Sequence, residues 1–439
     1  MRKTEGRTPI TRSETIASNA YRKIAFRLLP LLMICYVAAF LDRINIGFAQ
    51  LQMSDDLKFS GAVYGLGAGL FFVGYFFFEL PSNLYMHRVG AKATISRIML
   101  VWGVISALFA LVQTEWQFYL LRFFLGAAEA GFYPGVLLFI TYWFPSHRRG
   151  RANSLFLIAL PTAGLIGSPI SGFILSSMNG VQGMAGWRWL FIVESIPSLV
   201  LGLVCLAYLT NSPREAKWLS EAERNVVMTD IDAEIETKQE FAVSGIRDIF
   251  KSKTVWLLAA VAFCEGFGLY GLSFWLPTIV RGVGVTDTMH VALVSAIPFG
   301  CGVIAVVLFG KSSDRFLERR HHLASAFVLG AGGLSVSAWL GTGNVIVSLV
   351  ALSLGAAGVY SASALFWNYP GAFFLGVGTA AAFAVINSLG NLSGFFSPYI
   401  LGIIKDRTGA ASNGLYVISA IMIVGAFLAY RAPKSVVNR

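Results

Sequence analysis

The sequence predicts an all-α membrane protein in which twelve transmembrane helices form two pseudo-symmetric six-helix bundles. Composition is the first reason, because 56% of the 439 residues are hydrophobic and only 13% are charged, which is too apolar for a soluble surface of this size. A series of apolar runs of about 20 residues, the length that crosses a bilayer, is the second. The third is one long polar segment that divides these runs into two sets of six.

Each apolar run is long enough to cross ~30 Å of hydrocarbon as a helix. The first set is expected at residues 28–50, 62–84, 95–113, 117–143, 152–177 and 187–210. The second set is expected at residues 255–280, 289–310, 322–340, 344–366, 373–403 and 413–430. The run at 373–403 is longer than one crossing requires.

The polar segment determines the domain organisation that we expect. Its charged composition is typical of a linker, and Ser220 followed three residues later by Glu223 is a signal for the start of a surface helix. The expected parts are a cytoplasmic tail (1–27), an N-terminal bundle (28–210), a cytoplasmic linker (211–253), a C-terminal bundle (254–430) and a second cytoplasmic tail (431–439).

Positive charge is distributed unevenly between the two sides of the predicted spans. Most of the 34 lysines and arginines fall on the side of the termini. By the positive-inside rule, both ends of the chain are then expected in the cytoplasm, and the protein is expected in the cytoplasmic (inner or plasma) membrane. The first 27 residues are polar and basic, so we expect no cleaved signal peptide. The net charge of +11 is explained by basic loops against anionic lipid headgroups, and no nucleic-acid partner is expected.

The two halves repeat a short pattern of small residues. The segment GLIGSPISG (164–172) in the fifth span matches GNLSGFFSPYILG (390–402) in the eleventh. Glycines spaced in this way allow close helix packing in lipid, and the prolines favour local kinks. The repeat indicates that the linker joins two related bundles.

Charged residues inside the spans are the main candidates for function, since a charge among lipid tails is costly and rare. The alternative is a structural ion pair that only fixes helix packing. The spans contain Asp42, Arg43, Arg122, Glu129, Glu194 and Glu265. We expect Glu194 to be a structural latch near the cytoplasmic rim, and the role of Glu265 stays open.

The fourth span carries a polar stripe. Arg122, Gly126, Glu129 and Tyr133 follow the i, i+4, i+7, i+11 spacing of one helix face. Together with Asp42 and Arg43 of the first span, this stripe predicts a water-filled cavity with two cations and two carboxylates. A guanidinium binds a carboxylate through two hydrogen bonds, whereas a buried carboxylate can exchange a proton. Anion binding and proton coupling are therefore both possible at this site.

Signals for an enzyme, a cofactor or a metal are weak. The segment AVVLFGKSS (305–313) lacks the first glycine of a phosphate-binding loop, and no G-x-S-x-G nucleophile motif occurs. The histidines have no metal-ligand spacing, and the four cysteines are expected to act as apolar filling within spans. We expect no catalytic residues, no metal and no cofactor.

Several motifs resemble those of the major facilitator superfamily. GKSSDRFLERR (310–320) is similar to its signature loop, and GLIGSPISG to its motif in the fifth span. More specific segments resemble the anion:cation symporter branch, whose members typically import organic anions with protons. These segments are LDRINIGFA (41–49), RFFLGAAEAGFYPG (122–135), WRWLFIVES (187–195), SPREAKWLSEAER (212–224), YGLSFWLPTIV (270–280) and INSLGNLSGF (386–395).

The resemblance implies roles for particular positions. It makes Asp42 and Glu129 the proton-coupling pair, and Arg43 and Arg122 the groups that bind the substrate anion. It also points to Tyr75, Trp367 and Asn387 as residues of the cavity lining. The polar or aromatic character of their side chains within the spans adds Asn45, Tyr133, Tyr270 and Asn391 to the expected lining, although any aromatic residue here could instead be simple packing. The resemblance implies a gating role for Arg88, Asp314 and Arg315; in the first signature loop His87 stands where an acid is usual.

The function that these features favour is import of a small organic carboxylate in symport with protons, by alternating access. The protein is then expected to act as a monomer, with the carboxylate, protons and membrane lipid as its partners. One alternative is a proton-coupled exporter of drugs or metabolites with the same fold, against which the two arginines argue. Another is a membrane sensor that binds a solute without transporting it.

Overall fold

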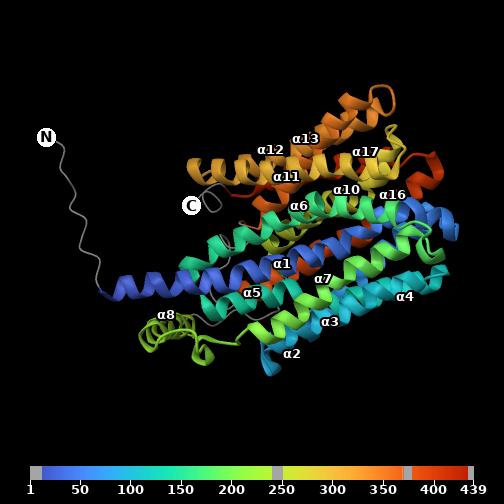
Figure 1. Cartoon of the computed structure of the whole chain (residues 1–439). Helices are drawn as coiled ribbons and strands as arrows, with labels where there is room; N and C mark the ends of the chain where they lie inside the picture. Colours follow the sequence, from blue (N-terminus) through green and yellow to red (C-terminus); the bar gives the residue numbers. More distant parts are fainter. Residues whose placement is uncertain (1–11, 240–250, 368, 370–377, 434–439) are drawn as a thin grey trace.

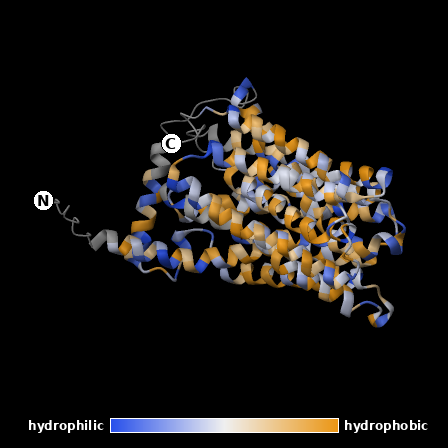
Figure 2. Cartoon of the chain, turned by 90° about the horizontal axis from the view of Figure 1, so that it is seen from above, coloured by the Kyte–Doolittle hydropathy of each residue, from blue (hydrophilic) through white to orange (hydrophobic). Residues whose placement is uncertain are grey.

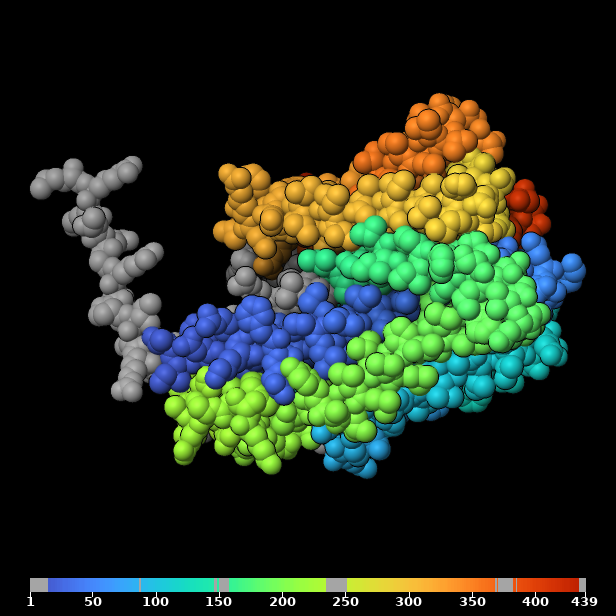
Figure 3. All heavy atoms as spheres, in the orientation of Figure 1, coloured from blue at the N-terminus to red at the C-terminus, as the bar shows by residue number. Residues whose placement is uncertain are grey.

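The computed structural model describes residues 12–239, 251–367, 369 and 378–433. Throughout these residues the regular elements are helices. They form two bundles that lie side by side with their axes roughly parallel (Figures 1 and 3). Apolar residues dominate the long middle portion of the helices, and hydrophilic residues gather toward the two ends of the molecule (Figure 2).

The N-terminal bundle contains the chain up to the linker. Its helices are α1 (Arg12–Leu57), α2 (Gly61–Val89), α3 (Ala91–Leu108), α4 (Glu115–Glu129), α5 (Phe132–Trp143), α6 (Ser146–Ser177) and α7 (Gly186–Tyr208), with short 3-10 turns at η1 (Phe109–Leu111) and η2 (Val181–Gly183). The linker adds η3 (Pro213–Glu215) and α8 (Glu221–Gln239).

The C-terminal bundle contains the remaining helices. They are α10 (Lys253–Gly282), α11 (Thr288–Phe316), α12 (Arg320–Leu340), α13 (Val345–Phe366), α15 (Gly378–Asn391), α16 (Ser393–Thr408) and α17 (Gly414–Arg431), with a 3-10 turn at η4 (Ala411–Asn413). The described residues include 11 helical spans that are long and apolar enough to cross a membrane. The span expected at 373–403 corresponds to α15 and α16, which meet at Leu392, and its first residues lie outside the described part.

The fourth span is broken near its middle. α4 ends at Glu129 and α5 begins at Phe132, with Gly131 between them in the left-handed conformation at φ +86. Glycine adopts this conformation readily because it lacks a Cβ. As a result, Tyr133 lies on α5, and its direction does not follow from the helical spacing of Arg122 and Glu129 on α4.

The N-terminal part of α1 packs against the linker helix. The Tyr21 hydroxyl donates to Asp230 Oδ2 at 2.9 Å, and Lys23 Nζ lies 2.7 Å from Glu223 Oε1. The hydrogen bond from the Lys23 ammonium lowers the pKa of Glu223. Glu223 also exchanges hydrogen bonds with Ser220, the reciprocal arrangement that the sequence predicts for the start of this helix.

The two bundles are joined at the end where α1 finishes and α2 begins. Asp406 of α16 accepts hydrogen bonds from the backbone N–H groups of Gly61 and Ala62, both at 2.7 Å. This carboxylate therefore caps the N-terminus of α2, a favourable place for negative charge. The Tyr64 hydroxyl of α2 donates to the carbonyl oxygen of Phe274 in α10 at 2.9 Å.

Candidate functional site: a cavity between the bundles

A cavity lies between the two bundles and is lined by residues of both. About 60 Å³ of it is accessible to the centres of water molecules, which is enough for several waters. Arg43 of α1 and Glu265 of α10 are the charged residues among its described lining. Its aromatic lining consists of Tyr36, Phe72, Tyr75, Tyr133, Tyr270 and Trp367, and its amide lining of Asn387 and Asn391.

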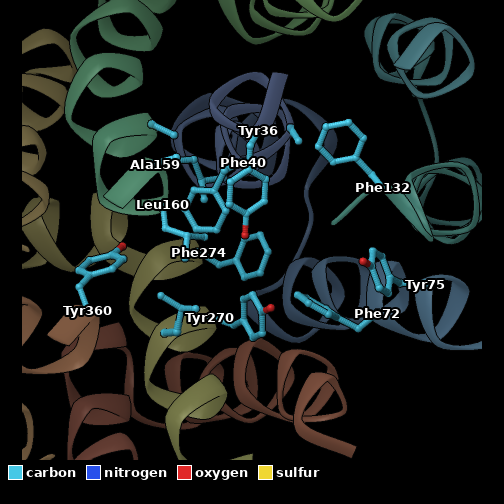
Figure 4. Close-up of a cluster of buried hydrophobic side chains, with 14 of the residues drawn as sticks. Tyr36, Phe40, Phe72, Tyr75, Phe132, Ala159, Leu160, Tyr270, Phe274 and Tyr360 are labelled. Carbon is cyan, nitrogen blue, oxygen red and sulfur yellow. The ribbon is translucent and has the colours of Figure 1, made fainter. Parts of the chain in front are cut away.

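Aromatic rings from different helices meet around this cavity (Figure 4). Phe72 of α2 and Tyr270 of α10 have ring centroids 4.4 Å apart, so this contact crosses from one bundle to the other. Tyr36 of α1 and Tyr133 of α5 are stacked at 5.2 Å within the N-terminal bundle. A movement of one bundle against the other would therefore open the Phe72–Tyr270 contact and leave the Tyr36–Tyr133 stack intact.

Arg43 forms a buried ion pair with Glu129. Its Nη2 atom contacts Glu129 Oε1, and the two side chains are 10% and 4% exposed. The Arg43 guanidinium also lies 5.0 Å from the Phe71 ring centroid. Because Glu129 is the last residue of α4, the break in the span leaves its carboxylate next to the cavity-lining cation. This ion pair therefore connects the first span with the fourth, and both of its members are residues that the sequence predicted for the site.

Asp42 points into the N-terminal bundle and does not line the cavity. Its carboxylate accepts hydrogen bonds from Trp102 Nε1 at 2.9 Å, from Ser106 Oγ at 2.8 Å and from Ser198 Oγ at 2.8 Å. These donors come from α3 and α7. They compensate the cost of burying a carboxylate, and they place Asp42 behind α1 as seen from the cavity.

Arg122 is fully buried beside the aromatic residues. Its Nε donates weakly to the Gly67 carbonyl oxygen at 3.4 Å, and its guanidinium lies 5.2 Å from the Phe71 ring and 5.9 Å from the Phe274 ring. Neither Nη atom has a hydrogen-bond partner among the described residues. A buried cation with unused donors can attract an anion or water.

The C-terminal bundle contributes amides to the same region. The Tyr270 hydroxyl donates to Asn391 Oδ1 at 3.2 Å, and Asn387 Nδ2 donates to Glu79 Oε1 at 2.8 Å. Glu79 of α2 is 7% exposed and was missed in the sequence, although a single acid in the run FFFELP is itself a signal of this kind. The Asn387–Glu79 hydrogen bond links the two bundles.

The other expected site residues are found in several places. Tyr75, Tyr133, Tyr270, Trp367, Asn387 and Asn391 line the cavity, whereas Asn45 is fully buried beside Asp42. Glu194, expected as a latch near the cytoplasmic rim, is instead 3% exposed inside the N-terminal bundle, where it accepts a hydrogen bond from Ser171 at 2.6 Å. Arg88, Asp314 and Arg315 are exposed near the ends of α2 and α11, and the His87 side chain lies outside the described part.

Sulfur atoms and possible metal ligands lie elsewhere. Cys35 and Cys205 approach to 3.5 Å between their Sγ atoms within the N-terminal bundle. Across the residues that the structure describes, no cluster of three or more His, Cys, Asp or Glu side chains could hold a metal ion.

Comparison with known proteins identifies the family. The family model described as Major Facilitator Superfamily matches residues 32–398. This chain belongs to the major facilitator superfamily. It is a multi-pass membrane transport protein for a small molecule and not an enzyme.

Relatives within the superfamily cover nearly the whole chain. An Agrobacterium vitis protein named "Putative tartrate transporter" is 43% identical over 431 residues, which are 97% of this chain and 94% of that protein. An Acinetobacter baumannii protein named "Quinolone resistance transporter" is 39% identical over 409 residues, 93% of this chain and 94% of that protein. The crystal structure of a D-xylose-proton symporter has the same fold, with a TM-score of 0.74 at 15% identity over 93% of this chain and 98% of that one.

Proposed function

We propose that this member of the superfamily imports a small organic carboxylate together with protons, as in the anion:cation symporter branch. The single observation that carries the proposal is the ion pair between Arg43 and Glu129 at the cavity. A guanidinium in this position is the group best suited to bind a carboxylate. One relative is named for tartrate, a hydroxy acid with two carboxylates, and this name supports organic carboxylates as the broad substrate class without deciding between mono- and dicarboxylates.

Competition for Arg43 is the proposed coupling step. While Glu129 is ionised, it occupies the guanidinium that a substrate carboxylate needs. A proton on Glu129 removes the negative charge and frees Arg43, so that the substrate anion takes the place of the protein carboxylate. Release of both to the cytoplasm restores the original pair. Proton and anion then move in the same direction because each favours binding of the other.

Arg122 and Asp42 are proposed to support this exchange from positions outside the cavity lining. The unpaired Nη atoms of Arg122 add positive potential near the aromatic wall, which favours an anion between the bundles. Asp42 stays the proposed second residue of the proton-coupling pair, and it relays the one coupled proton to or from Glu129 without carrying another. Its neighbour in the chain, Arg43, provides a direct link between its protonation and the cavity.

Alternating access follows from the contacts between bundles. With both termini in the cytoplasm of the cell, the Asp406 cap on α2 and the bond from Tyr64 to Phe274 lie at the external end. Opening to the outside would break these contacts as the bundles rock against each other. Arg88, Asp314 and Arg315 are proposed to act at the opposite, cytoplasmic end.

An exporter of drugs is the rival for which there is a specific reason, since one relative is named for quinolone resistance. Counterflow in proteoliposomes distinguishes the two functions. Exchange of labelled carboxylates that is stimulated by an inward proton gradient is expected for the importer. Exchange of quinolones or lipophilic cations, with none of small carboxylates, would overturn the proposed function. A thermal-shift screen of purified protein against small carboxylates selects the substrate for this assay, because a bound ligand raises the melting temperature.

A further inference from the structure

Glu265 is a buried carboxylate in the cavity wall, and the coupling step above does not use it. It lies on α10, is 7% exposed and lines the cavity. Ser363 of α13 lines the cavity beside it and is close enough to donate a hydrogen bond. The C-terminal bundle therefore places a carboxyl group in the same cavity that receives Arg43 from the N-terminal bundle.

This carboxylate has no cation of its own in the described part of the chain. No ion pair joins Glu265 to a lysine, arginine or histidine there. Arg43, the other charged group of the lining, is already paired with Glu129. A buried charge without a partner is costly. A ligand that brings a hydrogen-bond donor or a positive charge to Glu265 would therefore be bound more tightly than one without it.

Arg43 and Glu265 belong to opposite bundles, and the cavity wall that they share is rich in aromatic side chains. Tyr270 lines the cavity together with Arg43 and Glu265, and its ring contacts Phe72 (Figure 4). A solute held here meets a cation from one bundle, a carboxylate from the other, and flat ring faces. Planar molecules stack well on such faces.

We propose that Glu265 selects carboxylates that carry a second group able to donate a hydrogen bond or bear a positive charge, and that it rejects dicarboxylates. This inference rests on the proposed function, in which Arg43 binds the first carboxylate. A hydroxyl, amine or protonated ring nitrogen on the far side of the solute would satisfy Glu265. A second carboxylate would face it with like charge, and like charges at a buried contact strongly disfavour binding.

A matched series of rigid ligands tests the proposal. Binding of benzoate, para-hydroxybenzoate, para-aminomethylbenzoate and terephthalate is measured on full-length wild-type protein, Glu265→Gln and Glu194→Gln. The last variant makes the same chemical change at a buried carboxylate that is held by Ser171 and does not line the cavity. The quantity compared is the ratio of the terephthalate Kd to the para-aminomethylbenzoate Kd, which is independent of the fraction of folded protein.

In wild-type protein we expect para-aminomethylbenzoate to bind most tightly and terephthalate most weakly. The ratio should fall at least about tenfold in Glu265→Gln and stay unchanged in Glu194→Gln. If wild-type protein binds the series but Glu265→Gln leaves the ratio unaltered, the role of Glu265 is wrong and the carboxylate function stands. If wild-type protein binds terephthalate as tightly as para-aminomethylbenzoate, the selection is equally overturned. Failure of wild-type protein to bind any of the four contradicts both proposals.

Discussion

Replacing Glu129 with glutamine should remove the pH dependence of substrate binding. In the wild-type protein the ionised Glu129 competes with the substrate for Arg43. Affinity is therefore highest at low pH, where Glu129 is protonated, and falls as the pH rises and the carboxylate ionises. Glutamine has nearly the same shape but no charge, so the anion meets no such competitor at any pH.

The steepness of the pH dependence follows from the number of carboxylates that compete with the substrate for Arg43. One carboxylate, Glu129, pairs with the one guanidinium in the described cavity lining, so binding of one anion is linked to uptake of one proton. The apparent Kd of wild-type protein should then rise about tenfold for each pH unit once Glu129 is ionised. The slope for Glu129→Gln should be zero, with a Kd close to the low-pH value of wild-type protein.

Titration calorimetry of purified protein at a series of pH values gives both slopes. Glu194→Gln is the control, because Glu194 is also a buried carboxylate of the N-terminal bundle but pairs with Ser171; it should keep the wild-type slope. In proteoliposomes, Glu129→Gln should still exchange substrate downhill but should not accumulate it against a gradient. A Glu129→Gln protein whose affinity still falls tenfold per pH unit would refute competition at Arg43.

Three further changes test other parts of the site and the fold. Arg43→Lys keeps the charge but loses the planar pair of donors, so the same calorimetry should show at least about a tenfold weaker carboxylate affinity; an unchanged affinity would remove the guanidinium from the site. Asp406→Asn should weaken the hydrogen bond that caps α2 at Gly61, and it should raise the ratio of outward-open to outward-closed protein about fivefold. Cysteine-accessibility labelling at the external end measures this ratio. Equal labelling of the variant and the wild-type protein would show that Asp406 does not hold the two bundles together there. Gly126→Ala places a Cβ against the Phe71 carbonyl and should cost about 1–3 kcal/mol; an unchanged thermal unfolding midpoint would contradict this contact.

The spans and the two bundles could be predicted from the sequence because bilayer thickness fixes the length of an apolar run. The break in the fourth span could not. Gly131 adopts a left-handed conformation there, but glycine is also common within unbroken transmembrane helices. The eleventh span, expected as one run, is divided at Leu392 into α15 and α16. Hydropathy measures only how apolar a run is, so it does not show where a helix is interrupted.

The candidate site was partly predictable because charged residues are rare inside membrane spans. Charges in apolar runs marked Arg43 and Glu129, and helix geometry excluded Asp42 as the partner of its neighbour Arg43, but the sequence could not show which group of another helix Arg43 would meet. Neighbours on a helix point about 100° apart, and this turn sends Asp42 toward Trp102. The contact between Glu79 and Asn387 spans 308 positions in the chain, so no local pattern indicates it.

The exchange of partners at Arg43 is tested most directly by measuring proton and anion entry together. Proteoliposomes that contain a trapped pH indicator and no imposed gradient receive labelled carboxylate from outside. We predict that the lumen acidifies as the anion enters, with about one proton for each anion in the wild-type protein and no acidification in Glu129→Gln. Anion entry through the wild-type protein with no change in the pH of the lumen would contradict the coupling.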